Sequence, residues 1–201
     1  GTVAPNPYYT AEVADRCMKE IFLPTVEAMQ KEGCPFKGCL YFGLMLTPDG
    51  PKVIEYNCRF GDPETQVVLP LLESDLLKIM LATTNGTLDK TEVRFSAGAA
   101  ACVILASGGY PLAYEKGKEI TGLVNGQLPG SDAIVYHAGT AVQDGRLVTA
   151  GGRVLGVTAT AADLPAALEK AYAAADSIHF DKLHRRSDIG ARALAALKAR
   201  E

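Results

Sequence analysis

Residues 38–66 read GCLYFGLMLTPDGPKVIEYNCRFGDPETQ, two apolar runs joined by the sequence TPDG at residues 47–50. Pro in the second position of these four and Gly in the last are what a type I turn prefers. The flanking runs, residues 38–46 and 52–57, have strand composition, so the stretch predicts a β-hairpin. Asp62-Pro63 then has the pattern of a helix start, with Asp as the N-cap and Pro in the first helical position. We therefore expect a hairpin that leads directly into a helix.

The second strand carries the residues best suited to chemistry, Glu55 and Asn57. Side chains alternate along a strand, so these two share one face about 7 Å apart. Their carboxylate and amide oxygens suit Mg²⁺, which takes its remaining ligands from phosphate and water. Arg59 lies on the same side if the strand continues, and its planar guanidinium suits a phosphate or acyl phosphate oxygen. From spacing alone a solvated strand face is the simpler explanation, whereas the helix start just beyond, where anions bind well, favours a phosphoryl-transfer site.

Asp62 and Glu64 have a simple interpretation as helix chemistry. Asp62 is a good N-cap, and Glu64 in the first turn interacts favourably with the helix dipole. Taken by themselves, these two residues favour that structural interpretation over catalysis.

The first part of the chain is expected to extend from residue 1 to about residue 95. Thr10 predicts the N-cap of a helix that Pro24 kinks or restarts and that ends near Gly33. The helix that begins at Asp62 is expected to continue to about residue 84, with an interruption at Pro70. Residues 87–96 are polar and non-periodic, which places a domain boundary there and makes residues 96–201 a second domain.

The second domain is predicted to be β-rich and to end in a helix and a basic tail. The expected elements are strands 97–107, 119–123, 133–138 and 152–157, a hairpin at 144–145, a helix 164–178 and a tail from residue 182. His137 and Arg153 lie in Gly-flanked strands, where a ligand can approach the backbone closely. For His137 a structural role is the better interpretation. Arg153 is a candidate for binding a phosphate, with a structural salt bridge as an equal alternative. The tail is interpreted as a solvated face in which Arg186 pairs with Asp188.

Composition excludes several function classes. Hydrophobic residues make up 48 % of the chain and charged residues 21 %, with a net charge of −3, so no basic field predicts nucleic-acid binding. The five cysteines include no C-x-x-C pair, which fits a reducing cytoplasm better than a disulfide framework or a zinc site. There is neither a signal-like start nor an apolar run long enough to span a membrane.

The motif at residues 59–66 resembles the signature R-[LF]-G-D-P-E-x-[EQ] of the glycinamide ribonucleotide synthetase (phosphoribosylamine–glycine ligase) family, and it fits at every specified position. Residues 40–46 and 50–55 resemble the same family. Further stretches resemble it in the same order along the chain: residues 109–111, 116–117, 119–122, 137–140, 151–155 and 188–190.

This resemblance implies the α/β (α+β) architecture of an ATP-grasp enzyme. Residues 1–95 would be the C-terminal half of the ATP-grasp core and residues 96–201 the small β-rich C-terminal domain. Such an enzyme phosphorylates the carboxylate of glycine with ATP, and the amine of phosphoribosylamine attacks the resulting acyl phosphate. The products are ADP, phosphate and glycinamide ribonucleotide.

Carried over by position, the family's site residues fall in the hairpin region. Glu55 and Asn57 would bind Mg²⁺ or Mn²⁺ and the nucleotide, Arg59 would face the reacting phosphates, and Asp62 would lie near the substrates. Outside the hairpin region, Arg153 is our own candidate for binding the phosphate of phosphoribosylamine, inferred from its position after two glycines. Many ATP-grasp enzymes have a further acid on the preceding strand, but residues 41–46 contain none. The metal would therefore depend more on nucleotide phosphates and water.

A nucleotide clamp is missing from the sequence, because no Gly-rich phosphate loop with a following Lys occurs in it. We expect an N-terminal half of the same ligase to supply the clamp, and this chain alone to bind ATP weakly without turnover. Two alternatives remain open: another ATP-grasp ligase or carboxylase of the biotin-carboxylase type, and a non-catalytic assembly module.

Overall fold

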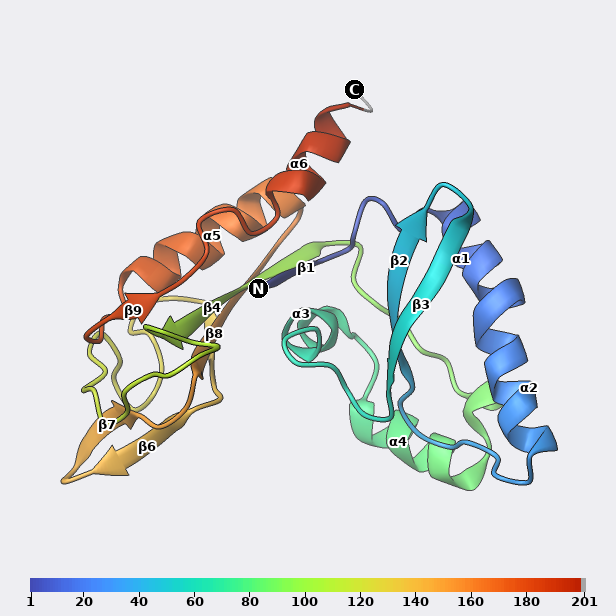
Figure 1. The fold of residues 1–201 in the computed structure, drawn as a ribbon, viewed down its shortest axis with the longest axis horizontal. Helices are drawn as coiled ribbons and strands as arrows, with labels where there is room; N and C mark the ends of the chain where they lie inside the picture. The colour runs from blue at the N-terminus through green and yellow to red at the C-terminus, as the bar shows by residue number, and fades with distance from the viewer. Residues whose placement is uncertain (200–201) are drawn as a thin grey trace. The chain divides into compact units, whose positions relative to one another are not determined.

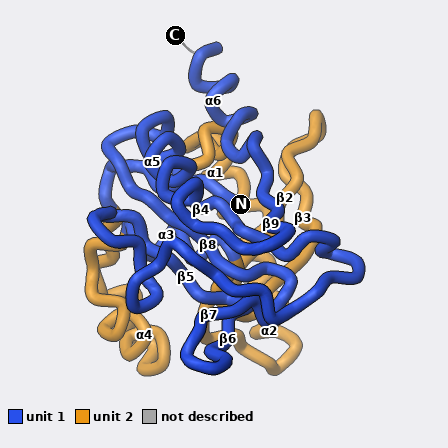
Figure 2. The backbone as a smooth tube through the Cα atoms, turned by 90° about the vertical axis from the view of Figure 1, so that its left-hand side faces the viewer, with its two compact units in different colours: residues 1–5, 63–71, 96–201 blue, residues 6–62, 72–95 orange. Residues whose placement is uncertain are grey.

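A computed structural model describes residues 1–199 of the chain, which form two compact units. The unit that we call the hairpin unit comprises residues 6–62 and 72–95. The unit that we call the sheet unit comprises residues 1–5, residues 63–71 and the chain from residue 96 onward (Figure 2). None of the helices within residues 1–199 has both the length and the apolar character that a bilayer crossing requires.

The hairpin unit opens with one long helical run: α1 (Ala11–Cys17), the π-helical turn η1 (Met18–Phe22) and α2 (Leu23–Lys31) (Figure 1). The Oγ1 of Thr10 accepts a hydrogen bond from the Val13 amide at 3.3 Å, which confirms the predicted N-cap. Pro24 has no N–H to donate, so the backbone widens into a π turn instead of breaking. The helix restarts with Pro24 in its first turn and ends before Gly33, whose φ is +78°.

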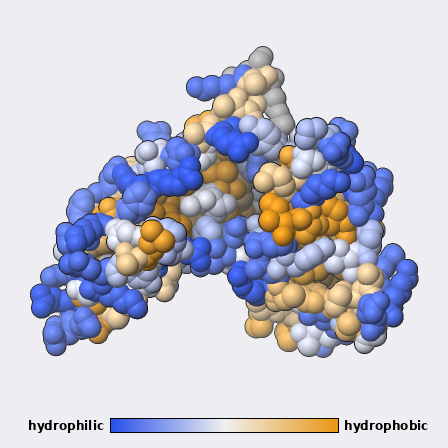
Figure 3. Space-filling view, in the orientation of Figure 1, coloured by the Kyte–Doolittle hydropathy of each residue, from blue (hydrophilic) through white to orange (hydrophobic). Residues whose placement is uncertain are grey.

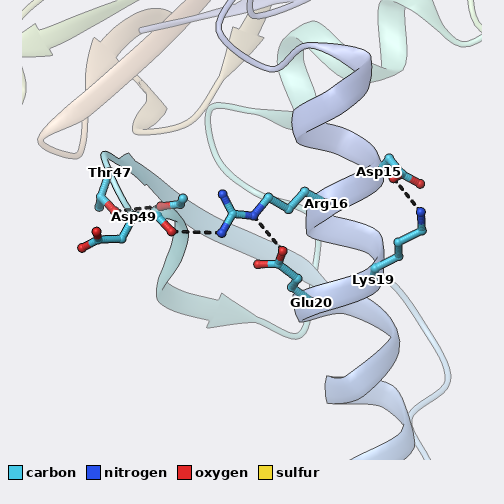
Figure 4. Close-up of polar contacts among 7 residues, drawn as sticks. Asp15, Arg16, Lys19, Glu20, Thr47 and Asp49 are labelled. Carbon is cyan, nitrogen blue, oxygen red and sulfur yellow. Dashed lines mark hydrogen bonds and ion pairs between the residues drawn. The ribbon is translucent and has the colours of Figure 1, made fainter.

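The predicted hairpin is confirmed as β2 (Tyr41–Thr47) paired antiparallel with β3 (Gly50–Asn57). Arg16 attaches helix α1 to its turn: the Nη2 group donates to the Asp49 carbonyl at 2.9 Å and the Nε group to Glu20 at 2.7 Å (Figure 4). The ring of Phe42 on β2 packs against Phe22 at 4.4 Å and Tyr56 at 5.4 Å between centroids. The helical run therefore covers the hairpin face that carries Phe42 and Tyr56.

The single interrupted helix expected from Asp62 to residue 84 is wrong. The chain forms a short α3 (Thr65–Val68), a 3₁₀ turn η2 (Leu69–Leu71) and then a separate α4 (Leu76–Asn85). The position before α3 is Glu64, without a side-chain cap, so Asp62 is not the N-cap. Helix α4 has its own cap, Asp75, whose carboxylate accepts from the Lys78 amide at 3.1 Å. A further 3₁₀ turn η3 (Leu88–Lys90) follows in the stretch expected to be irregular.

An antiparallel sheet of order β1-β4-β8-β5 forms the sheet unit, with β9 also paired to β4 (Figure 1). Its strands are β1 (Thr2–Ala4), β4 (Ala99–Ser107), β5 (Ile134–His137), β8 (Arg153–Ala161) and β9 (Leu183–His184). Strands β4, β5 and β8 confirm the predictions for this region. The predicted strand 119–123 is wrong: Glu119 and Thr121 make only isolated bridges.

Central strand β4 is buried on both faces because a helix covers each of them. Ala101, Val103 and Leu105 belong to the large apolar core that includes residues of α5 (Leu164–Asp176). On the other face, Ala100 and Cys102 pack in a second cluster with Val67 of α3. A strand with two covered faces should be apolar throughout, and the composition of β4 agrees.

The remaining elements extend this unit. Strands β6 (Thr140–Gln143) and β7 (Arg146–Thr149) form the expected hairpin, and its turn residues Asp144 and Gly145 have φ of +51° and +76°. Helix α6 (Ala191–Lys198) lies in the basic tail. Arg186 pairs with Asp188 as expected, through Nε at 2.7 Å and Nη2 at 2.6 Å.

Candidate functional site

A β-bulge determines which way Glu55 points. Gly43 on β2 lies opposite Glu55, whereas the next residue, Leu44, lies opposite Val53, so Ile54 is the extra residue on β3. Without this insertion, Val53 and Glu55 would share a face. With it, Val53 is on the face covered by the helical run, and Glu55 is on the opposite face. The extra residue, Ile54, is left 62 % exposed.

Glu55 and Asn57 lie on the same face and are in contact, as the sequence predicts. The Nδ2 group of Asn57 donates to the Oε1 atom of Glu55 at 3.2 Å. Glu55 is exposed and Asn57 half-buried. The pair therefore presents a carboxylate and an amide from one accessible face of the hairpin.

Gly43 provides the space for the Glu55 side chain. A Cβ atom built on Gly43 would lie 2.7 Å from the Cγ of Glu55, closer than real contacts permit. Residues 41–46, which include Gly43, contain no acid. In the structure, the absence of any side chain directly opposite Glu55 is what allows its carboxylate to occupy this face.

The oxygen atoms that Glu55 and Asn57 offer fit a divalent cation that takes its other ligands from a nucleotide. Mg²⁺ and Mn²⁺ prefer oxygen ligands, and both Glu55 and Asn57 supply one. Within residues 1–199, no group of three or more His, Cys, Asp or Glu side chains is placed to hold a metal by itself. A metal at this face would accordingly need further oxygens, which phosphate and water supply in such sites.

Arg59 and Asp62 follow the strand instead of extending it. Because β3 ends at Asn57, the strand does not continue to Arg59, and the condition for Arg59 to lie in register with Glu55 is not met. Its Nη1 group donates to the adjacent Phe60 carbonyl at 3.1 Å, and its side chain is exposed. Asp62 is also exposed and lies in the turn before α3. Both residues belong to the hairpin unit, which extends along the chain to Asp62 before α3 begins.

Arg153 lies in the sheet unit, and a second bulge determines its direction. Ala106 on β4 lies opposite Arg153, while Leu105 lies opposite Leu155, so Val154 is the extra residue. Val154 and Leu155 are both fully buried in the core under α5. Arg153 consequently lies on the other face, where with Ala106 it lines a cavity of about 270 Å³.

His137 is a structural residue, as the sequence analysis favoured. One ring nitrogen, Nδ1, is 3.0 Å from the Thr140 hydroxyl, and the other, Nε2, is 2.8 Å from the Gly126 carbonyl. A carbonyl only accepts, so Nε2 carries a proton and donates to Gly126. The ring of His137 therefore links β5 to the loop at Gly126 through Nε2 and to Thr140 of β6 through Nδ1.

Apolar side chains gather over the β2–β3 hairpin in Figure 3, and exposed ones on these strands include Met45, Leu46 and Ile54.

A cavity of about 560 Å³ lies between the hairpin and the helical run, lined by Ile21, Val53 and Tyr56 among others. This cavity is almost entirely apolar and lies on the face opposite Glu55. It is therefore not the place where the polar candidates meet a ligand.

Three polar residues that also line the Arg153 cavity are not predicted from the sequence: His184, Arg185 and Arg186. Arg186 was interpreted only as the partner of Asp188, and His184 was not considered. No local signal reveals them, because His184 comes to lie near Arg153 only through the pairing of β9 with β4, and the two arginines follow directly after β9.

The fold and site define the class to which the chain belongs, the ATP-grasp proteins. The biotin carboxylase domain of a thermophilic 2-oxoglutarate carboxylase superposes with a TM-score of 0.63 at 17 % identity, covering 91 % of this chain and 40 % of that one. A crystal structure of phosphoribosylamine–glycine ligase from Thermotoga maritima superposes with a TM-score of 0.78 at 39 % identity, covering 90 % of this chain and 44 % of that one.

Residues 1–65 match the family described as the phosphoribosylglycinamide synthetase ATP-grasp (A) domain, and residues 100–192 match the phosphoribosylglycinamide synthetase C domain. The chain belongs to the phosphoribosylglycinamide synthetase family. It is 47 % identical over 199 residues to the phosphoribosylamine–glycine ligase of Agrobacterium fabrum, covering 99 % of this chain and 46 % of that protein. It is also 48 % identical over 195 residues to a bifunctional purine biosynthetic protein of Pichia angusta, covering 96 % of this chain and 24 % of that protein. The chain thus spans less than half the length of these curated relatives.

Proposed function

We propose that this chain is part of a phosphoribosylamine–glycine ligase, which converts ATP, glycine and 5-phosphoribosylamine to ADP, phosphate and glycinamide ribonucleotide through glycyl phosphate. The reaction belongs to de novo purine biosynthesis. The observation that carries the proposal is the bulge-directed Glu55–Asn57 pair on one accessible face of the hairpin. The high identity to proteins named as this ligase supports the choice of substrates over those of other ATP-grasp enzymes.

Glu55 and Asn57 would hold Mg²⁺ or Mn²⁺ together with ATP. When bound, the divalent ion neutralises charge on the nucleotide phosphates. The two side chains contribute by position: Glu55 supplies an anionic oxygen and Asn57 an uncharged one, at a fixed separation on a rigid strand. This division keeps the site from accumulating the negative charge that two carboxylates would place beside a triphosphate.

Arg59 and Asp62 would act on the reacting groups. The Arg59 guanidinium donates hydrogen bonds to phosphate oxygens and stabilises the charge that develops during transfer to glycine. Asp62, three residues later, accepts a hydrogen bond from a substrate amine. Both are exposed, so neither must break a buried network to reach a substrate.

Arg153 would bind the phosphate of phosphoribosylamine, and residues upstream of this chain in the ligase would supply the nucleotide clamp. We propose that the two parts of the chain predicted from the sequence contact different substrates. Residues 1–95 would provide the metal and nucleotide contacts, and residues 96–201 the contact to the sugar phosphate.

The test is Glu55→Gln in the ligase that contains this chain. The variant keeps the shape of the side chain and removes its charge, so we expect Mg²⁺-dependent turnover to fall by about a hundredfold or more. The matched control is Glu27→Gln, at an exposed position of α2, which should leave turnover unchanged. Folding of both variants is checked by urea denaturation.

The substrates that the complete protein turns over distinguish the proposed ligase from a carboxylase and from a non-catalytic module. Turnover with glycine and phosphoribosylamine supports the proposal, whereas turnover with bicarbonate and biotin instead would assign the chain to a carboxylase. Wild-type turnover that Glu55→Gln leaves unchanged would remove Glu55 from the site. Absence of Mg·ATP binding in the complete protein would favour the non-catalytic assembly module.

A further inference from the structure

The cavity beside Arg153 has the composition of an anion site. Its lining includes three arginines and a histidine, Arg153, Arg185, Arg186 and His184, and none of the acidic side chains within residues 1–199. Its volume of about 270 Å³ is slightly below the range of about 300–1,000 Å³ typical of sites for drug-sized ligands. It can therefore take a phosphate group with part of the molecule that carries it.

The sheet places Arg153 and His184 on either side of one small residue. Ala106 on β4 pairs with Arg153 on β8 and with His184 on β9, so the three residues share a face. Neighbouring strands are about 4.8 Å apart, which puts the backbones of Arg153 and His184 about 10 Å apart across Ala106. Two long polar side chains that flank an alanine leave a hollow between them, with the alanine as its floor.

Tyr110 forms a wall of the same cavity. A Cβ atom built on Gly152 would lie 2.1 Å from the Tyr110 ring, so this glycine is what admits the ring beside Arg153.

The two arginines that follow β9 are engaged differently. Arg185 is paired with Asp176 of α5, and its guanidinium carbon lies 5.6 Å from the centroid of the Tyr172 ring, so its charge is directed to that helix. Arg186 pairs with Asp188 through Nε and Nη2 only. Its Nη1 group is not part of this pair and remains a donor for a ligand.

Tyr172 holds the backbone that carries Arg186. Its hydroxyl donates to the Arg186 carbonyl at 3.0 Å and accepts from the Ile189 amide at 2.9 Å. The pairing with Asp188 holds the guanidinium itself and lowers the pKa of that carboxyl. Because both the backbone and the guanidinium group of Arg186 are held in place, its side chain loses little conformational entropy when it binds an anion.

We propose that Arg186 is a second ligand, together with Arg153, for the phosphate monoester of a sugar phosphate bound in this cavity. The identity of that sugar phosphate as phosphoribosylamine rests on the proposed function. The phosphate accepts hydrogen bonds from both guanidinium groups, and the sugar extends toward the mouth of the cavity past Tyr110. His184 lies across the floor from Arg153 and adds a third donor when its ring nitrogen is protonated.

The experiment measures binding of ribose 5-phosphate, and of ribose as the phosphate-free probe, to the full chain by titration calorimetry. We expect wild type to bind ribose 5-phosphate and not ribose. Loss of one charge-assisted donor should weaken binding about ten- to a hundredfold in Arg186→Gln and Arg153→Gln. Arg186→Lys should recover part of the affinity, because lysine keeps the charge but not the planar fork. Arg192→Gln, on α6 and outside the cavity lining, is the matched control and should bind as wild type does.

A second measurement separates binding from structure. In the ligase that contains this chain, Arg186→Gln should raise KM for phosphoribosylamine and leave kcat and the KM for ATP and glycine nearly unchanged, because uniform substrate binding is lost. A general structural defect would instead change all three KM values or lower the urea midpoint.

The outcomes also distinguish this inference from the proposed function. If Glu55→Gln abolishes turnover while Arg186→Gln binds ribose 5-phosphate as tightly as wild type, Arg186 is not a ligand and the proposed ligase stands. If ribose 5-phosphate binding depends on Arg186 but glycine is not ligated, the phosphate site stands and the ligase fails. Equal binding of ribose and ribose 5-phosphate to wild type would overturn the inference.

Discussion

Two single-residue insertions aim the side chains on which the proposed chemistry depends. Ile54 on β3 shifts Glu55 away from the face covered by the helical run, and Val154 on β8 shifts Arg153 out of the core under α5. A bulge inserts one residue into the alternation and so reverses the faces of the residues on one side of it. Removing either insertion would turn a polar functional candidate toward an apolar surface, where an ionised group is costly.

The position opposite Glu55 can be tested with Gly43→Ala. The added Cβ would lie 2.7 Å from the Glu55 Cγ, so the Glu55 side chain must move. We expect the KM for Mg·ATP in the ligase to rise by about tenfold, since a misplaced ligand weakens metal binding, while folding is preserved. Met45→Ala, an exposed neighbour on β2, is the matched control. An unchanged KM in Gly43→Ala would show that the position of the Glu55 side chain is not critical.

At the scale of elements, a charge network attaches the loop after β4 to the turn before β9. Glu115 contacts Lys118 at 2.7 Å and Lys182 at 3.0 Å, and Lys118 also contacts Asp181 at 3.2 Å. Hydrogen bonds from Lys118 and Lys182, with their charges, lower the pKa of Glu115 from 4.5 to about 2. The network therefore holds a loop without regular structure against the strand that carries His184.

This network predicts a pH dependence of stability. The pKa of Glu115 in the folded chain lies below its ordinary value, so its stabilising effect is complete above about pH 4.5 and is lost as pH falls toward 2. We expect Glu115→Gln to lower the urea midpoint above pH 4.5 and the difference from wild type to close by pH 2. The group is exposed, so 1 M salt should reduce the difference wherever one is observed, that is, well above pH 2.

The control for that experiment is Glu169→Gln, which alters an exposed acid of α5 outside the network. Its midpoint should follow wild type across the same range. If Glu115→Gln and wild type differ by the same amount at pH 2 and pH 6, the network does not account for the low pKa.

At the scale of the whole molecule, chain order and compact units do not coincide. Residues 1–5 and 63–71 belong to the sheet unit, although most of the sheet follows residue 96 (Figure 2). Strand β1 pairs with β4, and Val67 of α3 covers the face of β4 opposite α5. The boundary near residue 95 remains a prediction about evolutionary domains, whereas the packing of β4 depends on segments from both sides of it.

Because residues 63–71 belong to the sheet unit, we expect a core mutation in this segment to destabilise that unit and not the hairpin unit. Val67 is 2 % exposed, and Val67→Ala should destabilise the sheet unit by about 2 kcal/mol. Hydrogen exchange should rise in β4 and β8 and stay unchanged in β2 and β3. Val53→Ala, in the hairpin unit, should give the reverse pattern. Faster exchange of β2 and β3 in Val67→Ala would contradict the assignment of residues 63–71 to the sheet unit.

Local chemistry was sufficient to predict much of this protein. The helix cap at Thr10, the hairpin across residues 47–50 and the apolar strand β4 each depend on neighbouring residues, and each is confirmed. The shared face of Glu55 and Asn57 also followed from the period of a strand, because both lie on the same side of the bulge. The family, too, was evident from the ordered motifs along the chain, of which residues 59–66 match the family signature at every specified position.

What only the tertiary structure decided is where those elements end and which residues far apart in sequence they bring together. The helix after Asp62 divides because α3 must cover β4, and packing of that kind overrides local capping signals. Neither bulge leaves a local signature, since an extra residue is defined only by the pairing of two strands. His184 and Arg153 meet across Ala106 for the same reason: backbone pairing over long sequence separations creates the cavity, and no pattern within one segment encodes it.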